Sequence, residues 1–403
     1  MGRILHFGLG NFARAHLLDY TADAGQWDVV GVSLRSAETR NRLAKQGFGY
    51  TLGVQGIGPK KITILRNILV APEDPHAVLD GINSADIISA TVTEKGYHLD
   101  ANGQLDLSDS AIAQDLKTQA PSTLISYLAF GLSTRTTPVT ILSCDNRIAN
   151  GQALKRAVKQ FAKAAHLTLD WSLFTFPNAM VDRITPATTD ALRNALNDPM
   201  AVPTEPFREW VIEDDFAGQR PDWPDVQFVR DVAPHELRKI RMLNGAHSLL
   251  AYSGIARGHE FVHQAIADPV LHDRVLTLMN EATKTLPIGA NDPSGAYASA
   301  LVKRFENPEL RHALRQIAMD GSQKTPYRFI ETIRDLLEMG EPADALVHGL
   351  KSWINFCIEE TREGLILDDP KAHQIAHAVQ SNDPVFELLK LVNAVDLHPL
   401  MQE

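Results

Sequence analysis

Four side chains that could handle a proton or an alcohol lie close together in the second half of the chain. They are a carboxylate, an amine, an amide and an imidazole, at Glu236, Lys239, Asn244 and His247. On a regular α-helix, at about 100° per residue, these positions fall within an arc of roughly 140°. Such a face could line a polar pocket, or it could be a charged surface in contact with solvent. The elements around it favour the pocket.

A glycine-rich turn near the N-terminus has the spacing of a dinucleotide-binding site. It follows an apolar run at 4–7 that predicts the first strand, and a helical pattern comes after it. In this context the first glycine permits a tight turn and the second lets the backbone approach a pyrophosphate. The alternative is a corner that needs glycine for steric reasons alone. The predicted contacts with the cofactor are Gly8, Gly10, Asn11, Phe12 and Ala13.

The end of the second predicted strand, at 28–34, lacks the acidic residue that often holds the ribose hydroxyls of NAD. Arg35 stands there instead. An arginine could lie over the adenine, pair with a 2′-phosphate, or simply be a solvated surface residue. The predicted cofactor is therefore NAD, with NADP left open.

Strand and helix patterns alternate in the first half of the chain. Apolar runs at 4–7, 28–34, 86–92 and 138–143 are each followed by polar residues and a helical stretch. This alternation predicts an α/β fold with a parallel sheet that helices cover on both faces. We expect a Rossmann-type, dinucleotide-binding domain over residues 1–234.

Helical patterns replace the strands from about Pro234 onward. The predicted helices are 236–252, 268–285, 296–305, 309–319, 325–339 and 342–361. Glycine and proline separate them. We expect a mostly α-helical substrate and catalytic domain over residues 235–403, with 202–230 as an irregular or β segment between the domains.

Composition narrows the class of protein. The 403 residues suffice for two sizeable cores, and the net charge of −10 argues against nonspecific nucleic-acid binding. Two cysteines, Cys144 and Cys357, make neither a disulfide framework nor a zinc cluster. No signal-peptide pattern or membrane-length apolar run is present. We expect a cytoplasmic protein whose partner is a small molecule, with its oligomeric state open.

Polar residues gather where three further strands are predicted to end. They occupy 91–97, 143–146 and 176–183. In open α/β sheets ligands bind at the carboxyl ends of strands, so these segments predict a polar cleft. Each segment alone could be only a turn or a helix cap.

Taken in order, these segments resemble the long-chain mannitol dehydrogenase family of polyol and hexonate dehydrogenases. The resemblance covers nearly the whole chain, and fructuronate reductases and mannitol 2-dehydrogenases are the most similar members. It rests on residues 8–16, 91–97, 143–146, 180–184, 204–207, 239–248 and 320–324.

The resemblance implies a metal-independent hydride transfer between a secondary alcohol and the nicotinamide. Lys239 would be the general base, which is feasible because desolvation lowers a lysine pKa from its ordinary value of about 10.4. Asn146 and Asn244 would donate hydrogen bonds to the developing alkoxide. His247 would bind substrate hydroxyls, and Glu236 would relay the proton to solvent.

Four more residues receive roles from the same resemblance. Thr93 and Glu94 would contact the cofactor, and Asp182 would lie near the substrate. Arg304 would supply a cation to the substrate, although it could equally be a surface arginine of the second domain.

Three other readings compete. A zinc alcohol dehydrogenase would need clustered Cys or His ligands, which the chain lacks. A β-hydroxyacid dehydrogenase would place lysine and asparagine four residues apart, whereas Lys239 and Asn244 are five apart. A non-catalytic dinucleotide sensor would have no need of a base.

We expect the substrate to be a sugar acid or a polyol, with D-mannonate and D-fructuronate favoured over mannitol and fructose. A buried carboxylate needs a cationic partner because an unpaired charge is costly to desolvate. The candidate partners are Arg208, Arg304, Lys324 and Arg328.

Overall fold

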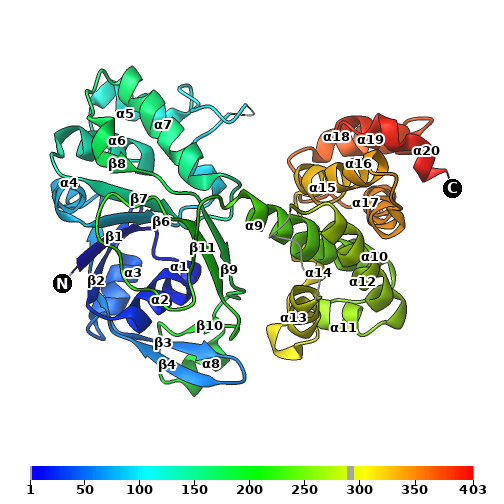
Figure 1. Ribbon diagram of the computed structural model, residues 1–403, viewed down its shortest axis with the longest axis horizontal. Coiled ribbons are helices and arrows are strands. Elements are labelled where there is room, and N and C mark those ends of the chain that lie inside the picture. Colours follow the sequence, from blue (N-terminus) through cyan, green and yellow to red (C-terminus); the bar gives the residue numbers. More distant parts are fainter. Residues whose placement is uncertain (1, 101, 288–294, 403) are drawn as a thin grey trace. The chain divides into compact units, whose positions relative to one another are not determined.

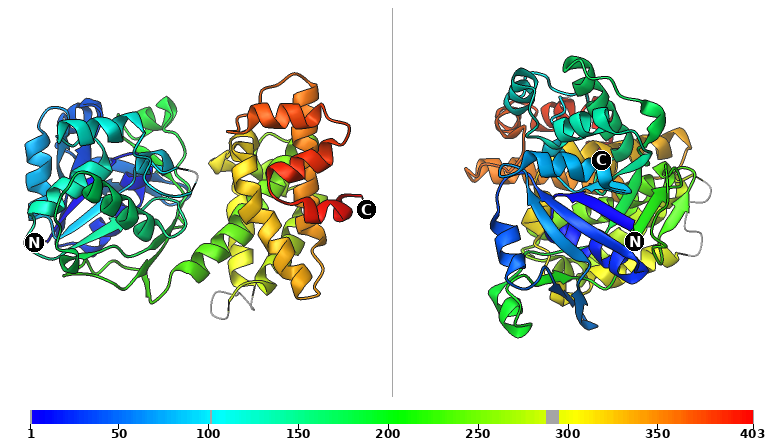
Figure 2. Two further views of the ribbon diagram at one scale, coloured as in Figure 1. Left: turned by 90° about the horizontal axis from the view of Figure 1, so that it is seen from above. Right: turned by 90° about the vertical axis from the view of Figure 1, so that its left-hand side faces the viewer.

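The computed structural model describes residues 2–100, 102–287 and 295–402. Contacts divide the chain into two compact units, Met1–Ala233 and Pro234–Glu403. The described strands all lie in the first unit, and the regular elements described in the second are helical (Figure 1, Figure 2). The fold class is the predicted one, a Rossmann-type parallel sheet followed by a mostly helical region.

A six-stranded parallel sheet forms the centre of the first unit, in the order β5-β2-β1-β6-β7-β8. Ile4 on the central strand pairs with Val29 on one side and with Ile87 on the other. This is the Rossmann order, and it reverses between β1 and β6, where such sheets bind ligands. The strands are β1 (Gly2–Phe7), β2 (Trp27–Ser33), β5 (Leu65–Val70), β6 (Ile87–Ala90), β7 (Val139–Ser143) and β8 (Phe174–Thr175).

Alternate residues of β1 pack against opposite layers. Leu5 and Phe7 share a core with α4 (Pro75–Ser84), α6 (Leu124–Thr134) and α7 (Asn150–Ala164), which cover one face of the sheet (Figure 1). Ile4 points the other way and shares a core with α2 (Leu17–Ala24). Because both faces are covered, the strands are continuous apolar runs, and the predicted strands are present as β1, β2, β6 and β7.

Two three-stranded sheets extend the unit, in the orders β10-β3-β4 and β12-β11-β9. The segment predicted to be irregular or β contains β10 (Val202–Thr204), β11 (Glu209–Glu213) and β12 (Gln227–Val229). The hairpin of β3 (Tyr50–Val54) and β4 (Gly58–Ile62) was not predicted. The other elements are α1 (Asn11–Ala15), α3 (Glu38–Ala44), η1 (Glu94–Tyr97), α5 (Ser110–Thr118), η2 (Trp171–Leu173), β9 (Ala179–Asp182) and α8 (Asp190–Ala195).

One helix, α10 (Gly245–Ala256), forms the centre of the second unit. Its residues are buried from Gly245 to Gly254, and it packs against α12 (Pro269–Lys284), α14 (Leu314–Ala318) and α17 (Asp344–Arg362). A helix surrounded in this way is apolar on most sides. None of the helices in the described ranges has the length and apolar character that a membrane span requires.

The helices predicted at 268–285 and 342–361 are present with changed bounds. The helix predicted at 309–319 is wrong, because η4 (Pro308–Leu310) and α14 are separated at 311–313, and the one predicted at 325–339 is divided between the π-helical turn η5 (Pro326–Ile330) and α16 (Glu331–Glu338). The run predicted at 236–252 is divided into α9 (Ala233–Arg238), the π-helical turn η3 (Lys239–Asn244) and α10, so a single α-helix was wrong. Only α13 (Ala296–Phe305) has its predicted bounds among the described helices. The remaining elements are α11 (Val262–Ile266), α15 (Gly321–Thr325), α18 (Ala372–Val379), α19 (Pro384–Leu391), η6 (Val395–Leu397) and α20 (His398–Met401).

Candidate active site

The turn after β1 uses its two glycines differently. Gly8 has a φ of +89°, and a Cβ there would lie 2.0 Å from the carbonyl oxygen of Thr91. Only glycine fits this close approach. At Gly10 a Cβ would meet no described atom within 4 Å. The fold therefore requires Gly8, whereas the open space beside Gly10 fits a bound phosphate.

The three residues after this turn are held by the protein itself. Asn11 donates from Nδ2 to Oγ1 of Thr188 over 3.1 Å. Phe12 stacks on the ring of His16, with centroids 5.0 Å apart. Ala13 is fully buried, as close helix–strand packing requires. The Asn11 side chain thus orders the turn, which leaves the backbone of α1 as the surface for a ligand.

A carboxylate at the end of β7 holds the loop that follows β6. The backbone amides of Val92 and Thr93 donate to Oδ1 of Asp145 over 2.9 and 3.0 Å, and the Tyr97 hydroxyl donates to Oδ2 over 3.0 Å. Thr93 has a φ of +68°, which is strained for a β-branched residue. Sequence analysis gave Asp145 no role of its own. An acid directly after a buried strand was the signal available.

The other predicted residues of this unit follow strand ends. Arg35 is exposed shortly after β2, and Glu94 begins η1. Asn146 is exposed after β7, and Asp182 is the buried last residue of β9. Because β1, β2, β6 and β7 are parallel, Gly8, Arg35, Thr93 and Asn146 all follow the same edge of the sheet.

In the second unit, the predicted catalytic helix contains a π-helical turn. It spans Lys239 to Asn244, and the amide of Gly245 donates to the carbonyl of Ile240, five residues earlier. Such turns are rare and occur frequently at functional sites. Arg241 fixes this turn from the outside, because its Nη1 lies 2.6 Å from Oδ2 of Asp335.

The π turn aligns the four predicted residues. Lys239 and Asn244 are five residues apart, which is about one turn where hydrogen bonds join residues five apart. Glu236 lies three residues before Lys239, and His247 lies three residues after Asn244, so each is a neighbour on the same face. On a regular α-helix the four side chains would spread over an arc of roughly 140° around the helix axis. With about 4.4 residues per π turn, that arc narrows to roughly 70°. On this helix geometry the four positions share one narrow face, and we call them the row.

His247 is a neutral imidazole at the end of this row. Its ring centroid lies 4.6 Å from that of Phe305 and 5.4 Å from that of His312. Burial is the largest cause that holds its pKa well below 6.5, and neighbouring cations lower the pKa further. These basic groups are His312, Arg304, Arg328 and Lys239. A neutral ring can both donate to and accept from a substrate hydroxyl.

Burial differs along the row. Glu236 and Lys239 are each 7% exposed, and so is Arg304 on α13. Arg304 is therefore not a surface arginine. Asn244 is partly exposed, and its side-chain amide makes no hydrogen bond to any residue in the described ranges. Lys239 is thus shielded from water, while the Asn244 amide can donate to a ligand.

A second π-helical turn packs on the first. It is η5, and it carries Arg328, whose Nη1 donates to Oγ of Ser248 over 2.8 Å and reaches the carbonyl oxygen of Asn244 at 3.5 Å. Gly245 lies at this contact, and a Cβ there would be 3.4 Å from the carbonyl oxygen of Arg328. Arg328 thereby braces the segment that carries Asn244 and His247.

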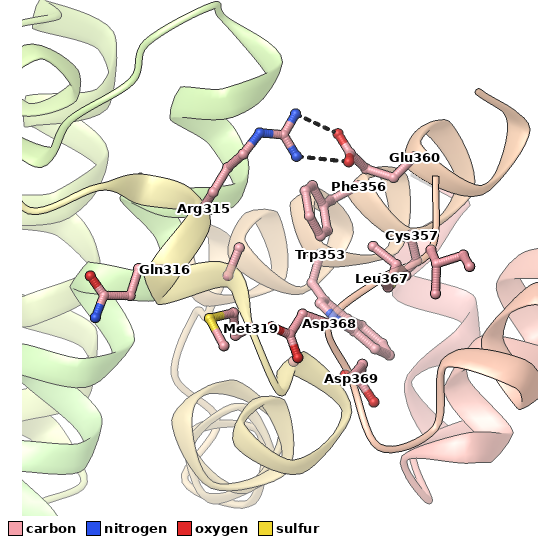
Figure 3. A pocket seen from close by; sticks show the side chains of 13 residues that line it. Arg315, Gln316, Met319, Trp353, Phe356, Cys357, Glu360, Leu367, Asp368 and Asp369 are labelled. Atoms are coloured by element: carbon pink, nitrogen blue, oxygen red, sulfur yellow. Dashed lines mark hydrogen bonds and ion pairs between the residues drawn. The ribbon is translucent and has the colours of Figure 1, made fainter. Parts of the chain in front are cut away.

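A separate pocket of about 320 Å³ lies in the second unit and shares no residue with this row. Figure 3 shows Arg315 and Glu360 paired at its edge, 2.8 Å apart, with Trp353 and Phe356 inside. Arg315 and Glu360 neutralise each other, and the lining presents no lysine or histidine that could act as a base. We therefore place the candidate active site at the row and not at this pocket.

Comparison with known proteins identifies the family. Residues 2–225 match the mannitol dehydrogenase Rossmann domain, and residues 231–399 match the mannitol dehydrogenase C-terminal domain. The chain belongs to the mannitol dehydrogenase family. It is therefore an oxidoreductase of a family that acts on CH–OH groups.

Relatives in this family match over most of their length. The chain is 38% identical to D-mannonate oxidoreductase of Escherichia coli (strain K12), over 96% of this chain and 88% of that protein. It is 33% identical to mannitol 2-dehydrogenase of Phaeosphaeria nodorum (strain SN15 / ATCC MYA-4574 / FGSC 10173), over 96% of this chain and 75% of that protein. The chain is also similar to a solved structure, the mannitol 2-dehydrogenase of Pseudomonas fluorescens in a ternary complex with NAD and D-mannitol. The identity is 31% and the TM-score is 0.82, and the match covers 99% of this chain and 92% of that one.

Two segments that resemble the mannitol dehydrogenase family are structural braces. Glu205, in 204–207, accepts the backbone amide of Ile184 at Oε1 over 2.6 Å. Ser322, in 320–324, donates its amide to Asp369 over 2.8 Å. Both segments thus hold neighbouring loops in place.

The spacing argument against a β-hydroxyacid dehydrogenase does not hold. A five-residue spacing across a π turn places lysine and asparagine as a four-residue spacing does in an α-helix. The match to the mannitol dehydrogenase family decides between the two classes instead. Among the described residues, no group of three or more His, Cys, Asp or Glu is arranged to hold a metal ion.

Proposed function

We propose that this protein transfers a hydride between a nicotinamide cofactor and the secondary alcohol or ketone of a linear sugar acid, with D-mannonate and D-fructuronate as the preferred pair. The aligned row from Glu236 to His247 carries this proposal, because it supplies a base, an oxyanion donor and a hydroxyl ligand. The 38% identity to a D-mannonate oxidoreductase supports the choice of substrate.

The first unit would bind the dinucleotide. The open space beside Gly10, the strand order and the polar edge formed by Arg35, Thr93 and Asn146 fit a dinucleotide whose pyrophosphate lies at the turn. NAD is favoured by likeness to the Pseudomonas fluorescens enzyme, which binds it. When bound, the nicotinamide would accept or donate the hydride. Arg35 leaves NADP as an alternative.

In the oxidation direction, the neutral amine of Lys239 would take the hydroxyl proton while the carbinol C–H bond gives up its hydride. Asn244 and Asn146 would donate hydrogen bonds to the alkoxide as charge develops. Because Lys239 is shielded from water, its proton needs a path out. Glu236, nearly one α-helical turn earlier, is the proposed relay. His247, Asp182 and Arg304 would hold the substrate.

A second candidate function is the oxidation of mannitol to fructose. Likeness to mannitol 2-dehydrogenases, at 31–33% identity over nearly the whole chain, supports this alternative. The free, buried Cys144 and Cys357 support a cytoplasmic location.

Steady-state reduction of fructuronate and fructose, with NADH and then with NADPH, tests the proposal. We expect the highest kcat/KM with fructuronate and NADH. A higher value with fructose would favour the second function, and no turnover of either ketone would refute both. If Arg35 binds a 2′-phosphate, Arg35→Ala should weaken NADPH binding alone.

A further inference from the structure

The structure separates the four cations that could pair with a substrate carboxylate. Arg208 is already paired in the first unit, with Nη1 3.0 Å from Asp19 and 2.8 Å from Asp23, and its guanidinium lies over the Tyr20 ring. Lys324 donates from Nζ to the carbonyl oxygen of Met319 over 2.6 Å. Both serve the fold, which leaves Arg304 and Arg328.

Arg328 makes no ion pair among the described residues, and the carboxylate of Asp320 acts on it only from a longer distance. Only its Nη1 makes hydrogen bonds within the described ranges, to Ser248 and toward the carbonyl of Asn244, and no described carboxylate lies within 4.0 Å of it. Arg328 is partly buried, and burial lowers its pKa to about 10, so the group is partly desolvated but still charged at neutral pH. A desolvated charge without a counter-ion costs stability unless a ligand compensates for it.

Its neighbourhood has a positive potential. Arg328, Arg304, Lys239 and His312 all lower the pKa of His247, which places each of these basic groups within electrostatic reach of that ring. The positive charge comes from the two arginines, because burial lowers the pKa of His312 and the proposed mechanism uses Lys239 as a neutral amine. An anionic group bound here would gain from the cluster, whereas a neutral hydroxymethyl group would not. Arg328 differs from the others because Ser248 fixes one end of its guanidinium and leaves Nε and Nη2 as donors.

We propose that Arg328 determines specificity by binding the terminal carboxylate of a linear sugar acid through Nε and Nη2, while Nη1 stays on Ser248. A planar guanidinium held at one nitrogen is prepared for a two-point contact with a carboxylate. The inference rests on the proposed function. Under this proposal Arg304 would bind hydroxyl groups of the substrate, and Arg328 would recognise its carboxylate.

Kinetics on paired ketones test this assignment. In Arg328→Met, kcat/KM for fructuronate should fall about 10- to 100-fold, mainly through KM, whereas the fructose value should change less than about threefold. Arg328→Lys should have a kcat/KM for fructuronate between those of Arg328→Met and the wild type, because an ammonium group cannot make the two-point contact of a guanidinium. Ser248→Ala should weaken fructuronate use to a smaller degree.

Arg334→Met is the matched control, since Arg334 is an arginine of the neighbouring α16 that pairs with Asp396 over 2.5 Å. This variant should leave kcat/KM unchanged for both fructuronate and fructose. Equal losses on fructuronate and fructose in Arg328→Met would show a brace for the fold and would overturn the proposal. An unchanged fructuronate value would also overturn it.

Calorimetry with D-mannonate and D-mannitol gives a readout that does not need turnover. Arg328→Met, checked for an unchanged melting temperature, should lose affinity for mannonate and keep that for mannitol. If wild type reduces fructose better than fructuronate, the proposed function fails. The assignment of Arg328 then stands only if the substitution still weakens mannonate binding selectively.

Discussion

Asn244 ends the π-helical turn that Lys239 begins. Five residues separate the two, and only a wider turn places them on one side of the helix. A regular α-helix would spread the base and the oxyanion donor over a broad arc. The extra residue in this turn therefore has a geometric consequence for the proposed chemistry, and it leads to a test.

Changes in chain length should separate the π turn from a regular helix. Deleting Ile240, which is partly buried, should convert the turn to α-helix and keep Lys239 and Asn244 in line at a spacing of four. We expect kcat within about tenfold of wild type. Inserting one alanine between Leu243 and Asn244 should rotate Lys239 away by about 100° and lower kcat at least about 100-fold. Similar activity in both variants, with both folded by circular dichroism, would contradict the geometry.

Loss of the proposed base should affect chemistry and leave cofactor binding intact. Lys239→Ala should lower the rate of alcohol oxidation at least about 100-fold. NADH affinity, measured by calorimetry, should be nearly unchanged. Lys303→Ala, an exposed lysine on α13, is the control and should retain full rate. Full activity in Lys239→Ala would remove the residue from the mechanism.

The parallel sheet could be predicted because its strands are continuous apolar runs between polar turns, as in 86–92 and 138–143. The hairpin at 50–62 could not, because Gly53, Gly56, Gly58 and two lysines interrupt its pattern. Short helices such as α11, with five residues, leave too little periodicity to detect. Fold class thus follows from long apolar segments, while small additions depend on tertiary packing.

Candidate residues for the site could be proposed from the sequence, but their spacing along the helix was interpreted with the wrong period. The spacing of three, five and three residues from Glu236 to His247 fits a helix with one π turn, but a 3.6-residue period was assumed. The ion pair of Arg208 with Asp19 joins positions 189 residues apart, so no local pattern could show that Arg208 was already paired. Excluding Arg208 and Lys324 as partners of a substrate carboxylate therefore required the three-dimensional structure.

Substitutions at the two glycines of the first turn should affect different properties, stability at Gly8 and cofactor binding at Gly10. Gly8→Ala should lower stability markedly, because its Cβ would clash with the Thr91 carbonyl at a φ that alanine disfavours. Gly10→Val should leave the melting temperature nearly unchanged and weaken NADH binding, because a side chain would fill the space proposed for the pyrophosphate. Normal NADH affinity in Gly10→Val would make this turn purely structural.

Asp145 should act on the cofactor through the loop it holds. Asp145→Asn leaves one acceptor oxygen for the amides of Val92 and Thr93 and the hydroxyl of Tyr97, at a cost of about 1–3 kcal/mol. We expect a higher KM for NADH and a lower melting temperature. Tyr97→Phe removes only one of these hydrogen bonds and should show a smaller effect. An unchanged KM with reduced stability would assign Asp145 to the fold alone.

Buried histidines should make the protein sensitive to acid. Burial lowers the pKa of His6 to about 4 and that of His16 to about 3, so both rings are neutral in the folded protein. In the unfolded chain they take up protons near pH 6.5. Their contribution is therefore present above pH 6.5 and is lost as pH falls toward 4.

Each such histidine should lower the free energy of unfolding by about 1.4 kcal/mol per pH unit in this window. Urea unfolding at pH 7.5, 6.0 and 5.0 measures the slope. His6→Asn removes one titrating ring and should flatten the slope by about that amount, although it should also lower stability at pH 7.5 by losing contacts with Ser89 and Gly8. His76→Asn changes an exposed histidine on α4 and is the matched control, which should leave the slope unaltered. The same slope in wild type and His6→Asn would show that His6 is not a source of the acid sensitivity.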